Sequence, residues 1–131
     1  DAFSEHFTFQ TLKDLLKKRK GSIKSALMNQ NIIAGIGNIY SDEILFQSGI
    51  HPKRSAGALD ESQLKHLYNE LKSVFRRSIQ SLTFNEPFPN EFLLPNREPG
   101  AVCPLCGGKI VKQTISGHSS YFCNQHQTDI S

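Results

Sequence analysis

Residues 31–38 read Asn-Ile-Ile-Ala-Gly-Ile-Gly-Asn, and this stretch decides the fold of the 131-residue chain. Two glycines stand two residues apart among isoleucines, a pattern that breaks a helix without opening a polar loop. Glycine reaches backbone conformations that cost other residues free energy, so we expect a compact, partly buried turn here. Ser22 can cap a short helix over residues 23–29 before the turn. A second helix over residues 39–48, ended by Gly49, is expected after it.

Apolar periodicity predicts two further helices. The first spans about residues 7–18 and buries one stripe, made of Phe9, Leu12, Leu15 and Leu16. The second begins at Asp60, which can cap it, because Gln63 follows three residues later at the spacing of a capping box. Apolar residues then recur at helical intervals to about residue 80, and we interpret them as core.

The composition changes after this helix. Pro87, Pro89, Pro95 and Pro99 interrupt every possible helix between residues 82 and 100, so we expect an extended connector there. Strand-like alternation over 109–115 and 119–122 around a Ser-Gly pair then predicts a β-hairpin. The sequence therefore predicts a mainly α fold, with a helical bundle over residues 1–82, a connector over 83–100 and a small β-hairpin unit over 101–131.

Four residues flank the hairpin at the spacing of a zinc site. Cys103 and Cys106 form one pair, and Cys123 and His126 form the second, each with two residues between its members. Zinc favours four tetrahedral thiolate or imidazole ligands, and a two-residue gap lets one tight turn present both members of a pair. Three cysteines, an odd number, also fit metal ligation better than a disulfide framework. We expect one structural zinc ion in a zinc finger, with His118 as the alternative to His126.

Composition and charge exclude several classes of protein. Hydrophobic residues make up 37% of the chain and charged residues 21%, which is typical of a globular protein. No apolar run approaches the roughly 18 residues of a spanning helix, and the first residues do not show the basic-then-apolar pattern that would indicate secretion. We therefore expect no membrane partner and a cytoplasmic location. Six basic residues gather in the first quarter, as a phosphate-facing surface or as a solvated helix end: Lys13, Lys17, Lys18, Arg19, Lys20 and Lys24.

Two parts of the chain resemble the bacterial formamidopyrimidine-DNA glycosylase and endonuclease VIII family. Residues 33–46 read Ile-Ala-Gly-Ile-Gly-Asn-Ile-Tyr-Ser-Asp-Glu-Ile-Leu-Phe and, with Gly-Ile-His-Pro at 49–52, look like the helix–two-turns–helix segment of that family. Residues 103–127 are similar to the zinc hairpin that ends those enzymes, and the pair Ile23-Lys24 matches as well. The resemblance covers nearly the whole chain, in the right order.

The resemblance implies base-excision repair of oxidised bases, of the formamidopyrimidine and 8-oxoguanine type, by a DNA glycosylase with AP lyase activity. It also implies that the protein acts in the nucleoid of a bacterium. The partner it implies is double-stranded DNA with a damaged base or an abasic site. The family's phosphate-contacting asparagine and lysine correspond to Asn38 and Lys24. Gly35, Gly37 and Tyr40 are further candidate DNA-binding residues, since amides on a tight turn before a helix also favour a phosphate on physical grounds.

Two positions depart from the family pattern. The family's zinc hairpin normally carries an arginine in its turn, which reaches toward the orphaned base and a phosphate, and His118 stands there in this chain. Histidine can hydrogen-bond a phosphate or stack on a base, but it cannot supply arginine's bidentate fork. An ordinary surface histidine is the alternative. The family usually has a fourth cysteine where this chain has His126, and zinc accepts either ligand.

The family's catalytic nucleophile has no counterpart in this sequence. It is the secondary amine of an N-terminal proline, followed by a glutamate, whereas this chain begins Asp1-Ala2-Phe3 and all six prolines are internal. We therefore expect the chain alone to be a monomer that binds damaged DNA weakly and releases no base, and to need an N-terminal catalytic domain as partner. Residues 84–92 are either a reduced form of the family's loop over the flipped base or a plain linker.

Two other functions stay open. The chain could be a standalone, non-catalytic zinc protein that binds DNA or RNA, or a zinc module for protein interaction whose basic run only aids solubility. Binding to duplex DNA that falls steeply with salt would exclude the second of these.

Overall fold

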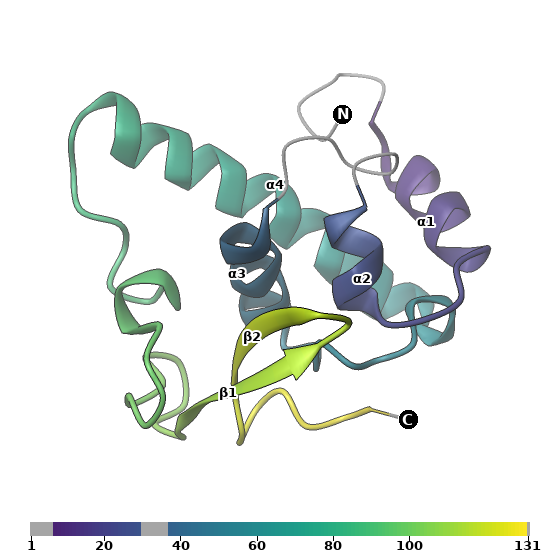
Figure 1. Cartoon of the computed structure of the whole chain (residues 1–131). Helices are drawn as coiled ribbons and strands as arrows, with labels where there is room; N and C mark the ends of the chain where they lie inside the picture. Colours follow the sequence, from purple (N-terminus) through teal and green to yellow (C-terminus); the bar gives the residue numbers. More distant parts are fainter. Residues whose placement is uncertain (1–6, 30–36, 131) are drawn as a thin grey trace.

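The computed structural model describes residues 7–29 and 37–130. It is mainly helical, with one two-stranded antiparallel sheet near the C-terminus (Figure 1). The elements in chain order are α1 (Phe9–Lys17), α2 (Ile23–Met28), α3 (Asn38–Ser48), α4 (Glu61–Thr83), β1 (Ile110–Ile115) and β2 (His118–Cys123), with short 3-10 helices η1 (Ala56–Ala58) and η2 (Leu94–Asn96). Within the described ranges, no helix has the length and apolar character needed to cross a bilayer.

The helices begin and end where local chemistry predicts. Ser22 Oγ accepts a hydrogen bond from the Ser25 amide at 3.1 Å and caps α2. Gly49 ends α3 in the left-handed conformation, at φ 70°. Asp60 and Gln63 form the expected capping box at the start of α4. The four expected helices are confirmed, and α4 continues to residue 83, beyond its expected end near residue 80.

Helix α3 lies at the centre of the molecule and is buried on almost every side (Figure 1). It packs against α2, α4 and β2. Residues 41–46 are all buried, and they include two carboxylates, Asp42 and Glu43, beside the apolar Ile44 and Leu45. Buried charges need partners, so these two side chains direct how the surrounding segments pack.

The connector after α4 is packed against the helices, which corrects the expectation of an extended linker. Phe92 and Leu93 are buried, and Phe92 belongs to the main core. The amides of Leu93 and Leu94 donate to the two carboxylate oxygens of Glu43, each at 2.8 Å. Arg77 of α4 covers the Phe92 ring, 4.7 Å from its centroid. Prolines exclude a long helix here, but they leave the apolar residues between them free to enter the core.

The hairpin is confirmed, with Ser116 and Gly117 as its turn. Both turn residues have positive φ, at 53° and 82°, which matches the turn type whose twist suits two paired strands. Phe122 of β2 packs on His51, with ring centroids 4.5 Å apart. Ser116 Oγ lies 3.0 Å from Ser22 Oγ, so the turn contacts the residue that caps α2.

Candidate metal centre and nucleic-acid interface

Four potential metal ligands meet at the base of the hairpin: Cys103, Cys106, Cys123 and His126. Their donor atoms all lie within 4.8 Å of one another. Cys106 Sγ is 3.4 Å from Cys123 Sγ and 3.5 Å from His126 Nδ1, and Cys103 Sγ is 3.6 Å from the same nitrogen. Tetrahedral zinc with ordinary bond lengths separates two sulfurs by about 3.8 Å and a sulfur from a nitrogen by about 3.6 Å. The donor set therefore fits zinc in kind, number and spacing.

His126 is oriented toward this cluster by a second bond. Its Nε2 lies 3.1 Å from the carbonyl oxygen of Phe46 in α3. A carbonyl only accepts, so Nε2 carries the proton and Nδ1 is left as the free ligand nitrogen. The same ring packs edge-on against the Phe46 side chain, with centroids 5.0 Å apart. His118, the alternative fourth ligand, stands outside the cluster at the start of β2.

Backbone amides point at all three sulfurs. The amides of Leu105, Gly108 and Gln125 lie 3.4, 3.4 and 3.3 Å from the sulfurs of Cys103, Cys106 and Cys123. The Gly108 amide lowers the pKa of Cys106 to about 7, whereas burial raises the pKa of Cys103 to about 11. A bound cation would favour the thiolate at every position, and the amides would share that negative charge.

The start of α3 is joined to the hairpin by Asn38. Its Nδ2 donates to the carbonyl of Ser119 at 2.9 Å, while its Oδ1 is buried and has no hydrogen-bond partner among the described residues. Gly37, which is exposed, occupies the cap position and supplies no side-chain bond to the helix. Within the described part of the chain, no side chain caps the first amides of α3, and these N–H groups lie on the helix end that is bonded to β2, the strand that begins at His118.

Lys24 does not face solvent, which corrects the expectation of a direct phosphate contact. Its side chain is 0% exposed, and its ammonium is bonded to Asp42. Burial lowers the pKa of Lys24, although the Asp42 carboxylate opposes this shift. Because an unpaired buried charge is costly, the lysine is held by its acidic partner inside the molecule.

The remaining basic residues of the first quarter differ in their surroundings. Lys13 forms an ion pair with Glu61 at 3.3 Å. Lys17, Lys18 and Lys20 are exposed, at the end of α1 and in the segment after it. With Lys24 buried as well, the predicted basic cluster is divided.

The other predicted DNA-binding residues lie in different settings. Tyr40 is half-buried, and its ring packs 6.0 Å from that of Phe75 in α4, so the side chain contributes to the core. His118 is exposed at the tip of the hairpin. Gly35 falls outside the described residues, and its predicted role stays a prediction.

Several residues that bond one element to another were missed by sequence reasoning. Asp42, Glu43, Arg97 and Gln127 all bond backbone or charged groups across elements. The signal for the first two was limited to the apolar residues on either side of them, Ile39 and Tyr40 before and Ile44, Leu45 and Phe46 after. For Arg97 and Gln127 the local sequence carried no such signal.

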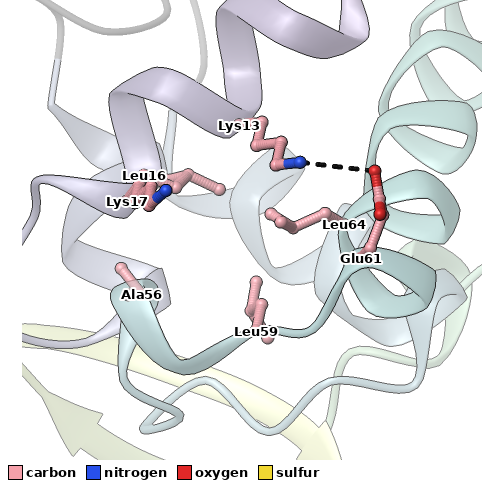
Figure 2. A pocket seen from close by; sticks show the side chains of 8 residues that line it. Lys13, Leu16, Lys17, Ala56, Leu59, Glu61 and Leu64 are labelled. Carbon is pink, nitrogen blue, oxygen red and sulfur yellow. Dashed lines mark hydrogen bonds and ion pairs between the residues drawn. The ribbon is translucent and has the colours of Figure 1, made fainter.

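A pocket of about 150 Å³ lies apart from these residues, between α1 and the start of α4 (Figure 2). The Lys13–Glu61 ion pair spans its rim, and Figure 2 shows apolar side chains turned into it. Neither charged partner is fully buried, so the pair contributes little to stability. The pocket contains none of the predicted site residues; its lining consists of Lys13, Leu16, Lys17, Ala56, Gly57, Leu59, Glu61 and Leu64.

Known proteins are similar to this chain in both sequence and fold. The family model described as the formamidopyrimidine-DNA glycosylase H2TH domain matches residues 1–85. A formamidopyrimidine-DNA glycosylase of Prochlorococcus marinus (strain NATL2A) is 38% identical over 133 residues, which cover 94% of this chain and 47% of that protein.

Two solved structures of the Lactococcus lactis enzyme Fpg share the fold. Its complex with DNA that contains an abasic site superposes with a TM-score of 0.81 at 25% identity, covering 98% of this chain and 51% of that one. Its complex with DNA that contains FAPY-dG gives a TM-score of 0.84 at 26% identity, covering 98% and 50%.

These matches agree on one assignment. The H2TH model matches well over half of the chain, and the same family accounts for the similarity in sequence and in structure. The chain spans about half the length of these relatives. The chain belongs to the formamidopyrimidine-DNA glycosylase family and corresponds to the C-terminal part of its members.

Proposed function

We propose that this chain is the DNA-binding part of a base-excision-repair glycosylase that acts on oxidised bases. The observation that carries the proposal is the bond from Asn38 to Ser119, which brings the start of α3 beside the exposed His118. Both are groups that favour a phosphate, and relatives of this fold have been solved on damaged DNA. Base release would then need residues beyond these 131, since the relatives are about twice as long.

The start of α3 supports phosphate binding through its backbone. The first amides of a helix have no intrahelical partner, and the helix dipole adds partial positive charge at the same point. Asn38 Nδ2 has two protons and uses one on Ser119, so the second is available to a phosphate oxygen. His118 adds a donor on the neighbouring strand, and we propose that it contacts the DNA backbone or an unpaired base.

We also propose that the four-residue cluster holds one structural zinc ion. Cys103, Cys106, Cys123 and His126 would be its ligands, and their spacing leaves no open position for a substrate. The ion would keep the two ends of the hairpin together and supply no chemistry. Purified chain should contain about one zinc per molecule, and Cys106→Ser should lose most of it.

Binding to a duplex with an abasic-site analogue tests the DNA assignment. Asn38→Ala and His118→Ala should each weaken binding by roughly three- to tenfold, the size expected for one or two polar contacts. Affinity should also fall steeply as salt rises, because phosphate contacts release counterions. Fluorescence anisotropy at two or three salt concentrations measures both effects.

Asn69 and His66 provide matched controls. Both are exposed residues of α4, a helix that contributes none of the proposed DNA-binding residues. Asn69→Ala and His66→Ala should leave affinity within twofold. The assignment fails if the wild-type chain does not bind the duplex at low salt, or if the control variants weaken binding as much as the site variants.

A further inference from the structure

The outer edge of β2 is bonded by side chains where a third strand would otherwise pair. The Ser119 carbonyl accepts from Asn38 Nδ2 at 2.9 Å, and the Tyr121 amide donates to Asp42 Oδ2 at 3.0 Å. Further along, the Cys123 amide donates to Gln127 Oε1 at 2.8 Å. Two of these three partners come from α3, so the hairpin is bound to that helix through its backbone.

The spacing of the two α3 partners explains why they fit. Asn38 and Asp42 are four residues apart, which is about 6 Å along a helix. Ser119 and Tyr121 are two residues apart, which is between 6 and 7 Å along a strand. A helix and a strand that lie side by side therefore present matching groups at both points, and the pair of bonds sets the register between them.

The bond between Asp42 and Tyr121 is the more firmly held of the two, because the Asp42 carboxylate is bonded from three directions. Its other oxygen binds the ammonium of Lys24 in α2, and Arg97 of the connector shares Oδ2 with Tyr121. The Asp42 side chain is 0% exposed, and that of Arg97 is 14% exposed. Arg97 also covers the Tyr121 ring, 4.4 Å from its centroid. The carboxylate thus ties α2, the connector and β2 to one point on α3.

We propose that Asp42 is a positioning residue for DNA binding. By holding the Tyr121 amide, it fixes the hairpin against the start of α3, so that His118 and Asn38 meet the same stretch of phosphates. Lys24 and Arg97 then act on DNA binding through Asp42 without touching the DNA. This inference rests on the proposed function, and it adds the residue that makes the two contact points one surface.

The variant Asp42→Asn tests this role. Both carboxylate oxygens of Asp42 accept from donors. The NH2 group of asparagine would face one of these donors, lose that hydrogen bond and weaken the attachment of the hairpin to α3. Glu43→Gln is the matched control. Glu43 is on the same helix and equally buried, and its oxygens also face donors, but they bind the connector amides of Leu93 and Leu94. We expect at least a tenfold loss of affinity for the abasic duplex in Asp42→Asn and at most threefold in Glu43→Gln, with one zinc retained in both.

A double-mutant cycle with His118→Ala separates positioning from a general loss of stability. If Asp42 positions His118, removing the histidine should cost several-fold in the wild-type chain and almost nothing in Asp42→Asn. Should Asp42→Asn fail to fold, Arg97→Gln takes its place in the cycle, since Arg97 is less buried and holds the same carboxylate.

The results of these binding measurements distinguish a failure of the positioning role from a failure of the proposed function. Equal losses in Asp42→Asn and Glu43→Gln, or the same cost of His118→Ala in both backgrounds, overturn the positioning role. A wild-type chain that does not bind the duplex overturns the proposed function, and the positioning role with it.

Discussion

Gly108 is packed tightly against the second pair of potential metal ligands. A Cβ placed there would lie 2.6 Å from Gln125 Cβ and 3.0 Å from the sulfur of Cys123. Gly108→Ala must therefore push the second ligand pair away from the first. We expect its affinity for zinc to fall at least tenfold, as for other changes just outside a ligand shell. Competition against a chromophoric chelator measures this directly.

Gly107 supplies the control for that prediction. It has φ 80°, but a Cβ there would meet no atom of the described residues within 4 Å. Gly107→Ala adds only backbone strain, about 1 kcal/mol, so zinc affinity should fall by about fivefold or less. Equal losses in the two variants would contradict the steric explanation.

Single residues also show what the sequence could and could not predict. The group of four potential ligands was predictable from Cys103, Cys106, Cys123 and His126. Two residues separate the members of each pair, and this spacing lets one tight turn present both to a metal ion. The burial of Lys24 was not, because a lysine next to a basic run has the same local pattern whether it faces water or a carboxylate. Its partner Asp42 lies 18 residues away, and only the packing of α2 on α3 brings the two together.

At the scale of elements, the packed connector is the part of the structure that most changes the expected architecture. Phe92 is 0% exposed and lies in the main core, whereas Phe84, at the end of α4, is 66% exposed. Phe92→Ala should therefore lower the free energy of unfolding by about 3 to 5 kcal/mol. Phe84→Ala should change it by no more than about 0.5 kcal/mol. Urea denaturation of both variants gives the comparison, and similar values would mean that the connector is not part of the core.

The helices themselves were predictable because their signals are local. Caps at Ser22 and Asp60, and the stop at Gly49, each act within one turn. The connector was not predictable in the same way. Its prolines indicate irregular backbone, but the burial of Phe92 depends on Arg77 and Glu43, which come from two different helices.

At the scale of the whole molecule, the hairpin and the helices share a core. Phe46 of α3 lies in one cluster with Leu93, Cys103, Ile110 and Cys123. Removal of metal should therefore weaken the helical part as well as the hairpin. We expect a chelator to lower the thermal midpoint by about 10 °C or more, since a small metal-bound unit scarcely folds without its ion. Circular dichroism at 222 nm follows mainly the helices and so reports the shared effect.

The way in which the transition changes is also informative. A single transition, shifted to lower temperature by the chelator and restored by added zinc, would agree with a shared core. An unchanged helical transition beside a lost hairpin would show instead that the two parts unfold independently.

The side chains along β2 have a consequence for solubility. An uncovered strand edge presents free amides and carbonyls to any other chain, and such edges are where folded proteins begin to aggregate. Here Asn38, Asp42 and Gln127 occupy that edge within the molecule. The residues that orient the hairpin therefore also protect the β2 edge of a two-stranded sheet, which has little strength of its own, from pairing with a neighbour. Variants that loosen the hairpin should precipitate at concentrations that the wild-type chain tolerates.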